Sequence, residues 1–284
     1  MLHPQTSLRV NGRLLSWDTP LIMGILNLTP DSFFDGGKYN QSTEQAVERA
    51  GNMLEEGAAI IDLGGMSSRP GARIISPEEE AERVLPVIEA LSRHFPEAIL
   101  SIDTLHAGVA HQAIRAGAHL INDISAGRLD QDMFQTAAEL QVPYILMHMQ
   151  GLPHGMQQNP TYENVVQEVF DFFTEHIKQL RQLGLHDIII DPGFGFGKSL
   201  EHNYTLLRHL FAFKAFDLPL LIGISRKSMI NSVLHTQPQD ALNGTTAVHM
   251  LALQAGADIL RVHDVAAARE AIAIWEVWQQ AAPF

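Results

Sequence analysis

Short, almost uninterrupted apolar runs recur along most of the chain, and longer amphipathic stretches separate them. We predict eight strands from these runs, at residues 21–28, 59–64, 98–103, 119–124, 143–149, 187–191, 219–225 and 257–263. Continuous rather than alternating hydrophobicity is typical of strands buried on both faces, as in a parallel sheet covered by helices. The pattern therefore predicts an α/β protein built on a parallel sheet.

The stretches between the runs have the apolar spacing of helices, as in residues 42–56. Glycine marks several of the points where such a helix gives way to the next strand: Gly57, Gly117 and Gly256. Because glycine adopts the left-handed conformation without a steric penalty, we predict that these residues end their helices.

Eight strand-then-helix units with short connections favour one closed (βα)8 TIM barrel, with residues 1–284 forming a single domain. An open, doubly wound sheet of the Rossmann type is the alternative, since strand order cannot be read from a sequence. At residues 8–17, two short apolar-containing runs flank Asn11 and Gly12, a pair that favours a tight turn. We therefore predict a small N-terminal β-hairpin before the barrel.

Composition narrows the functional classes. The 284 residues include 19 Lys and Arg against 32 Asp and Glu, a formal charge of −13, which argues against nucleic-acid binding. The absence of cysteine excludes disulfides, thiolate catalysis and cysteine-based metal sites, and fits a reducing compartment. No apolar run is long enough for a membrane span, and no secretory signal stands at the N-terminus. We expect a cytoplasmic protein.

Polar side chains stand at the carboxyl end of every predicted strand. In a (βα)8 barrel these ends form one mouth, where catalytic residues are found, so together they predict a small-molecule pocket. The residues are Asn27, Asp62, Asp103, Asn122, Asp123, His148, Asp191, Ser225, Arg226, Lys227, Arg261 and His263.

Two kinds of chemistry are present in this set. Asp103, Asn122 and Asp191 are suited to accept hydrogen bonds from a flat nucleobase-like or pterin-like heterocycle, with Lys227 as a donor. On the eighth strand, Arg261 and His263 lie where such barrels often hold phosphate, and Asn27 becomes their neighbour once the barrel closes. A diphosphate there would usually bring Mg²⁺.

Two loops, at residues 29–37 and 64–72, follow the first and second strands and combine glycine and proline with polar side chains. We interpret them as mobile lids over the mouth. Residues 191–199 end in Gly-Lys-Ser but carry Pro192 where a phosphate-binding P-loop needs glycine, so this is no Walker motif. The fourteen histidines include no His-Glu-x-x-His pattern, and His148 fits a pocket wall or a packed core residue equally well.

Seven segments, in order, resemble the dihydropteroate synthases, the folate-pathway enzymes that sulfonamides inhibit. They cover nearly the whole chain: GILNLTPDSF at 24–33, GGMSSRPGA at 64–72, SIDT at 101–104, NDI at 122–124, DPGFGFGK at 191–198, SRKS at 225–228 and RVHDV at 261–265. A series of separate motifs in family order is far more specific than any one of them. The resemblance implies a (βα)8 barrel, usually dimeric, which agrees with the strand pattern.

The same resemblance implies roles for individual residues. The pterin ring would lie against Asp103, Asn122, Asp191 and Lys227, and the diphosphate with its Mg²⁺ against Asn27, Arg261 and His263. Catalytic roles would fall to Asp103, Lys227, Arg69 and Asp35. The p-aminobenzoate and diphosphate sites would be completed by Thr29, Asp31, Phe33, Ser68, Arg69, Pro70, Gly195, Phe196 and Ser228. The implied reaction joins 6-hydroxymethyl-7,8-dihydropterin diphosphate to p-aminobenzoate.

The chain departs from the family pattern in its two loops. Where the family commonly has Glu-Ser-Thr-Arg, this chain has Met66, Ser67, Ser68 and Arg69, so a hydroxyl is kept and a carboxylate is lost; Phe34 replaces a commonly small residue. Two other interpretations stay open. A barrel methyltransferase that transfers a methyl group from methyltetrahydrofolate to a corrinoid protein would not need these loops, and a non-catalytic pterin-binding barrel would show decay such as Met66.

Overall fold

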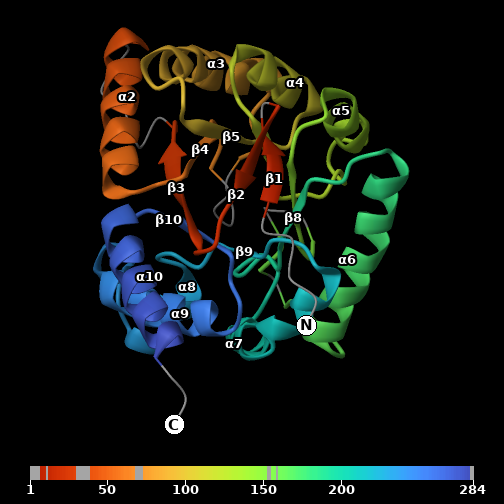
Figure 1. The fold of residues 1–284 in the computed structure, drawn as a ribbon. Coiled ribbons are helices and arrows are strands. Elements are labelled where there is room, and N and C mark those ends of the chain that lie inside the picture. Colours follow the sequence, from red (N-terminus) through yellow and green to blue (C-terminus); the bar gives the residue numbers. More distant parts are fainter. Residues whose placement is uncertain are drawn as a thin grey trace.

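The computed structural model describes residues 7–10, 12–29, 39–67, 73–151, 155–157 and 159–281. Eight parallel strands lie at the centre of the molecule, helices surround them, and a two-stranded antiparallel hairpin lies across one end (Figure 1). The strands are β3 (Leu21–Asn27), β4 (Ile60–Gly64), β5 (Ile99–Asp103), β6 (Leu120–Asp123), β7 (Tyr144–Met147), β8 (Ile188–Asp191), β9 (Leu221–Ile222) and β10 (Ile259–Val262), and the hairpin is β1 (Ser7–Val10) with β2 (Arg13–Ser16).

The connections between consecutive barrel strands are helical. The α-helices of the described residues are α2 (Tyr39–Glu56), α3 (Pro77–His94), α4 (Ala107–Ala116), α5 (Met133–Leu140), α6 (Val165–Gln182), α7 (Leu200–Arg208), α8 (Ser228–Leu234), α9 (Leu242–Gln254) and α10 (Val265–Gln280), with 3₁₀ turns η1 (Leu210–Phe216) and η2 (Pro238–Asp240). None of these helices has the length and apolar character needed to cross a bilayer.

The sheet closes on itself, so the open-sheet alternative is wrong. Its strand order is β8-β7-β6-β5-β4-β3-β10-β9, in which the first and last strands of the barrel, β3 and β10, are paired. A single parallel bridge between Ile190 and Leu220 then joins β8 to the residue before β9. Strand β9 is shorter than the predicted 219–225 because the chain turns after Gly223, where the Lys227 amide donates to the carbonyl of Ile224 over 3.2 Å.

The predicted glycine caps are confirmed by the backbone. Gly57, Gly117 and Gly256 have φ of 111°, 118° and 97°, which places them in the left-handed region. The amide of Gly117 donates back to the carbonyls of the last turn of α4, and no residue with a Cβ adopts this φ easily. Each glycine thereby turns the chain from a helix into the next strand.

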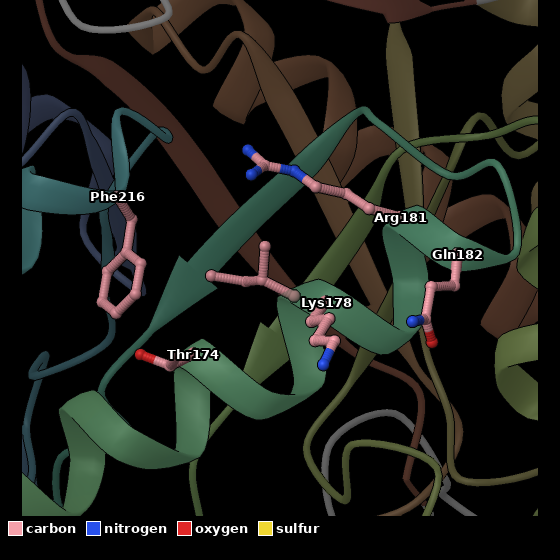
Figure 2. A pocket seen from close by; sticks show the side chains of 6 residues that line it. Thr174, Lys178, Arg181, Gln182 and Phe216 are labelled. Atoms are coloured by element: carbon pink, nitrogen blue, oxygen red, sulfur yellow. The ribbon is translucent and has the colours of Figure 1, made fainter.

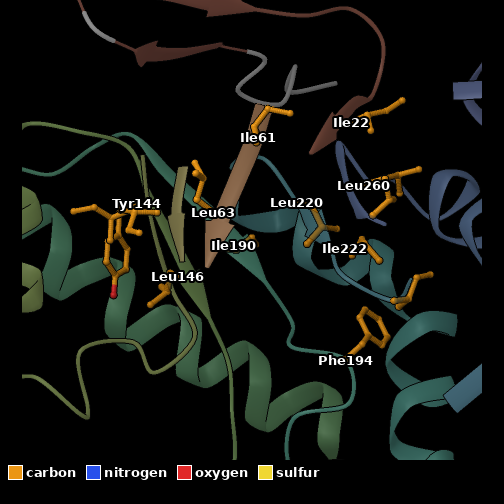
Figure 3. Packing of buried hydrophobic residues seen from close by; sticks show 14 of the residues in the cluster. Ile22, Ile61, Leu63, Tyr144, Leu146, Ile190, Phe194, Leu220, Ile222 and Leu260 are labelled. Carbon is orange, nitrogen blue, oxygen red and sulfur yellow. The ribbon is translucent and has the colours of Figure 1, made fainter. Parts of the chain in front are cut away.

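Side chains alternate along each strand between the helix layer and the barrel interior. The outward set packs against the helices and includes Ile61, Leu63, Leu146, Ile190 and Leu260 (Figure 3). The neighbouring positions therefore face inward, as the twofold period of a strand requires. This alternation decides which polar residues reach the interior.

At the amino ends of the strands the interior is apolar. Hairpin side chains pack there against the first inward residue of most strands, forming a cluster that we call the amino plug. Its members are Leu8, Val10, Trp17, Met23, Ile60, Leu120, Ile145, Ile189, Leu221 and Ile259. The predicted hairpin is thus confirmed, and it closes the end of the barrel opposite to the carboxyl ends of the strands.

Candidate functional site

The last inward position of the strands is polar on nearly every side of the barrel. Moving one pleat from the amino plug toward the carboxyl ends replaces Ile60 by Asp62, Leu120 by Asn122, Ile189 by Asp191 and Ile259 by Arg261. We call this group the carboxyl mouth; its inward residues are Asn27, Asp62, Asp103, Asn122, Asp191 and Arg261. Their side chains converge because parallel strands end at the same edge of the barrel.

Arg261 connects three strands across the mouth. Its Nε donates to Asp62 Oδ2 over 2.6 Å, and its Nη2 donates to Asp103 Oδ2 over 2.7 Å. The Asn122 amide donates to the same Asp62 oxygen over 2.9 Å. A guanidinium fork suits two carboxylates at once, and the pairing fixes the ends of β4, β5 and β10 relative to one another.

The electrostatics of this group are set by burial. Burial raises the pKa of Asp103 to about 7, against the opposing charge of Arg261, and the neighbouring Asp62 adds to the rise. Asp62 is fully buried. A positive centre that developed beside these two carboxylates would relieve their mutual repulsion, which is a way for the mouth to favour a cation.

On the opposite side of the mouth, Asp191 and Lys227 flank Gly223. A Cβ at Gly223 would lie 3.8 Å from both Asp191 Oδ2 and Lys227 Nζ, so glycine leaves room for the two side chains. The Lys227 ammonium donates to the carbonyl of Phe194 over 2.6 Å and lies 4.5 Å from the centre of the Phe196 ring. Burial lowers the pKa of Lys227 to about 8, while Asp191 raises it.

The segment between β9 and α8 is tied to the end of β10. Arg226, whose φ is 58°, donates from Nε and Nη2 to the Asp264 carboxylate over 2.8 and 2.5 Å. Its amide donates to Thr245 Oγ1 over 3.1 Å. These bonds hold a residue in the left-handed region and so fix the adjoining Lys227 and Ser228 over the mouth.

His263 lies just beyond the end of β10. Its Nδ1 is 3.0 Å from Ser225 Oγ, and its amide donates to the same oxygen over 3.2 Å. Nδ1 accepts from the hydroxyl in one ring tautomer and donates to it in the other. Burial lowers the pKa of His263 to about 4, so the ring is neutral at neutral pH and carries one N–H.

The structure thus brings together many of the predicted site residues. Asp103, Asn122 and Arg261 meet in one network, whereas Asp191, Lys227 and Phe196 form a second group; Gly195 lies against the Lys227 side chain, with an ideal Cβ 3.2 Å from its Cδ. Asn27 is half-buried at the end of β3, three residues beyond the pair that Gly24 makes with Val262 on β10.

Several predicted residues lie outside the described part of the chain. They are Asp31, Phe33, Phe34, Asp35, Ser68, Arg69 and Pro70. The two loops that we interpreted as lids are described only at Thr29 and at Gly64 to Ser67. Met66, the residue that departs from the family pattern, packs against an apolar cluster at the mouth formed by Leu105, Ile124, Met147, Met149, Met156 and Phe196.

Two adjacent residues that the sequence analysis grouped are separated by the pleat. Asn122 faces the interior, whereas Asp123 faces the helix layer, where it accepts from the Tyr144 hydroxyl over 2.7 Å and from two backbone amides. Asp123 is therefore structural.

Sequence reasoning gave no role to two buried residues that the structure shows to be central. Asp62 was only a polar strand end, yet it accepts from both Arg261 and Asn122. Lys198 belonged to a rejected motif, yet its Nζ lies 2.9 Å from His148 Nδ1. A lysine in a glycine-rich loop directly after a buried strand is the signal that could have identified it.

Among the described residues, a separate hollow lies on the outer face of α6, away from the mouth (Figure 2). Its lining consists of Thr174, Ile177, Lys178, Arg181, Gln182 and Phe216. The set offers two cations and an amide but no carboxylate or histidine for acid–base chemistry, so the carboxyl mouth is the better candidate site.

Comparison with known proteins identifies the family of this chain. The family model described as "Pterin binding enzyme" matches residues 23–263. Dihydropteroate synthase of Escherichia coli (strain K12) is 47% identical over 93% of this chain and 94% of its own length.

Solved structures extend the likeness to the fold. Yersinia pestis dihydropteroate synthase in a sulfonamide drug complex has a TM-score of 0.91 and 45% identity, covering 97% of this chain and 100% of its own. Xanthomonas albilineans dihydropteroate synthase with 4-aminobenzoic acid has a TM-score of 0.90 and 43% identity, covering 98% and 99%. The chain therefore belongs to the pterin-binding enzymes and, among them, to the dihydropteroate synthase family.

Proposed function

We propose that this chain condenses 6-hydroxymethyl-7,8-dihydropterin diphosphate with p-aminobenzoate, giving 7,8-dihydropteroate and diphosphate. The observation that carries this proposal is the mouth itself, in which carboxylates, an amide and two cations meet at or just beyond the carboxyl ends of separate strands. Such a set matches a flat, polar heterocycle with a charged leaving group. The family supplies the reaction, a transfer that forms a C–N bond.

The pterin ring is assigned to Asp103, Asn122, Asp191 and Lys227. Carboxylate and amide oxygens accept from the amino and ring N–H groups, and the Lys227 ammonium donates to a ring nitrogen or carbonyl. Burial raises the pKa of Asp191, and the nearby Lys227 charge opposes this effect and so favours the ionised carboxylate, which accepts hydrogen bonds.

The diphosphate is assigned to Asn27, Arg261 and His263. Arg261 uses its Nε–H and one Nη2–H on Asp62 and Asp103, which leaves further guanidinium N–H groups for phosphate oxygens. The neutral His263 adds an Nε2–H in the tautomer whose Nδ1 accepts from the Ser225 hydroxyl. Because Asp62 and Asp103 fix the guanidinium beforehand, little reorganisation is needed when the leaving group acquires charge.

The described residues also bear on the expected Mg²⁺. Within the described chain, no group of three His, Asp or Glu side chains gathers to hold a metal. A lone amide oxygen at Asn27 fits an ion that arrives with the diphosphate and keeps most of its ligands from phosphate and water. When bound, Mg²⁺ would neutralise charge on the departing diphosphate.

Catalysis in this mouth needs electrostatics rather than a strong base. The electron-rich pterin stabilises positive charge at its exocyclic methylene, so the C–O bond can break before the weakly nucleophilic aniline attacks. Asp103 and Asp191 favour that cation. Arg261 and His263 hold the diphosphate.

We assign the aniline substrate, p-aminobenzoate, to the loop that contains Phe194, whose carbonyl accepts from Lys227. We assign Phe196, Gly195 and Ser228 to its border. The family resemblance assigns the loop residues Phe33, Asp35, Ser68, Arg69 and Pro70 to the same substrate, with the role of excluding water, which would otherwise capture the cation.

A turnover assay tests the function. Purified protein is given the pterin diphosphate and Mg²⁺ with and without p-aminobenzoate, diphosphate release is followed, and the product is identified by mass. We expect dihydropteroate only when both substrates are present. Binding of the pterin without turnover would reject the catalytic assignment and point to Met66 in the second lid.

We also propose that the protein is a homodimer in the cytoplasm. Exposed apolar side chains cluster on neighbouring helices, with Ile274, Val277 and Trp278 on one face of α10 and Leu251 on α9, whereas Trp275 packs against the barrel. Such a face is typical of an interface between subunits. Light scattering of the wild type and of Val277→Glu tests this: a monomeric wild type would contradict it. The absence of cysteine supports the reducing compartment.

A further inference from the structure

We infer that Lys198 is a positioning residue for the reaction: its buried ammonium holds the loop of residues 193–197 against the end of β7 and thereby fixes Lys227 and Phe196 in the mouth. The inference rests on the proposed function for its kinetic consequence, but its structural part stands on the contacts of Lys198 alone.

Lys198 is 2% exposed and sits in a cage of acceptors. Its Nζ lies 2.9 Å from His148 Nδ1, 2.9 Å from the carbonyl of Gly193 and 3.1 Å from that of Phe196. The carbonyl of His148 is a fourth acceptor at 3.4 Å, so the three N–H groups of the ammonium are shared among four acceptors. Burial lowers the pKa of Lys198, and the Asp191 carboxylate opposes the effect.

His148 completes the cage as an acceptor. Burial and then the charge of Lys198 lower the pKa of His148 well below its ordinary value, so the ring is neutral and accepts through Nδ1. Its ring packs edge-on against Phe172 at 4.9 Å between centroids. The question of whether His148 is a pocket wall or a core residue is thus resolved in favour of a buried support.

The caged loop runs directly against the chain that follows β7. Gly193, Gly195 and Gly197 have φ of 69°, 79° and 62°. A Cβ at Gly193 would overlap the carbonyl of His148, and one at Gly197 would overlap that of Gln150. With no side chain between the two backbones, Lys198 cross-links them. Asn203 Oδ1, which accepts from the Gly195 amide, and the Tyr162 hydroxyl, which donates to the Gly197 carbonyl, bind the same loop from other parts of the chain.

The same loop also contacts Lys227 in the carboxyl mouth. The carbonyl of Phe194 accepts from Lys227, and the Phe196 ring lies beneath its ammonium. Lys198 therefore acts on the substrates through the position of this loop, and also through its charge, which lowers the pKa of Asp191. A loop misplacement of about 1 Å is enough to lower turnover about 10²-fold.

The chain has no cysteine, so a single introduced thiol allows a direct test. Lys198→Cys is unfolded, alkylated with 2-bromoethylamine to restore an ammonium of nearly lysine length, and refolded. Alkylation with 1-iodopropane gives a neutral side chain of similar size. Wild type taken through the same cycle, and Lys178→Cys at an exposed position of α6 with both adducts, are the controls.

The measurements are kcat and KM for both substrates, and amide hydrogen exchange of residues 193–197 without substrates. We expect the propyl form to lose about 10²-fold in kcat/KM for p-aminobenzoate and to exchange faster in the loop, and the aminoethyl form to recover most of both. Both Lys178 adducts should match wild type.

A folded propyl form with wild-type kinetics and loop exchange would overturn the inference. If the propyl form does not refold, Lys198→Arg, which keeps the charge but is too large for the cage, takes its place; wild-type KM and kcat in that variant would also overturn it. If wild type that was never unfolded shows no turnover, the proposed function fails, while loop exchange still tests the role of Lys198.

Discussion

The two ends of the barrel are built from inward-facing positions of the same strands, but they differ completely in chemistry. The amino plug is apolar and is sealed by the hairpin residues Leu8 and Trp17. One pleat away, the carboxyl mouth holds Asp62, Asp103 and Arg261 in contact. The residues that stabilise the fold and the residues proposed for catalysis therefore lie at opposite ends of the barrel. Substitutions in the plug should lower stability, and substitutions in the mouth should lower activity.

The largest effect is expected at the mouth. Lys227→Met removes the ammonium that faces the pterin and should lower kcat/KM about 10²- to 10³-fold. Lys227 lies at a mouth rather than in the apolar core, so the melting temperature should change little. Steady-state kinetics and thermal unfolding check both parts, with Lys178→Met as the control. A variant that melts far below wild type would break the separation of the two ends.

The amino plug should show the reverse. Leu8 is fully buried, and Leu8→Ala leaves a cavity that should lower the free energy of unfolding by about 2–5 kcal/mol. Leu14 in the same hairpin is 71% exposed, and Leu14→Ala should change the free energy of unfolding by less than about 0.5 kcal/mol. Denaturant unfolding measures the difference. Assayed well below its melting temperature, Leu8→Ala should keep wild-type kcat, and a large loss of kcat would refute the comparison.

The pH should also act on the mouth and not on the plug. With a pKa of about 8, Lys227 loses its proton above that pH, and kcat/KM should fall about tenfold per unit there. The contribution of Lys227 to the free energy of unfolding changes in the opposite direction to the rate. Because the unfolded chain keeps this proton to a higher pH than the folded chain, stability rises with pH between about pH 8 and the ordinary lysine pKa.

Rate profiles and melting temperatures of wild type and Lys227→Met across this range test the prediction. At each pH, the difference between the melting temperatures of wild type and Lys227→Met gives the contribution of Lys227. A wild-type rate that stays flat to pH 9.5 would contradict the assignment.

The smallest effect is expected at Asn27. Asn27→Ala removes a lone amide oxygen and should raise the Mg²⁺ concentration for half-maximal rate about tenfold, while binding of the unphosphorylated pterin stays unchanged. Calorimetry with and without Mg²⁺ measures both. Equal losses for the phosphorylated and unphosphorylated ligands would remove Asn27 from the diphosphate site.

The contrast between the ends also explains what the sequence could predict. All eight strands were located within a few residues, because buried parallel strands leave continuous apolar runs, and the positions of Gly57, Gly117 and Gly256 marked the helix ends. The polar strand ends were equally visible. What the sequence could not show was pairing: nothing local connects Arg261 to Asp62, 199 residues away, or Lys198 to His148, 50 residues away. The sequence also could not show that Trp278 is exposed while Trp275 packs against the core, because this depends on how α10 packs against its neighbours.

The incomplete seam between β8 and β9 has a mechanical consequence. Only the bridge between Ile190 and Leu220 joins these strands, and the two sides of the seam present Asp191 and Lys227 to the mouth. A flat ring bound to both side chains would span the gap and connect the two strands where they lack backbone hydrogen bonds. Occupancy of the site would thus tighten the fold where its own ladder is weakest, so a ligand would slow exchange of amides on both sides of the seam.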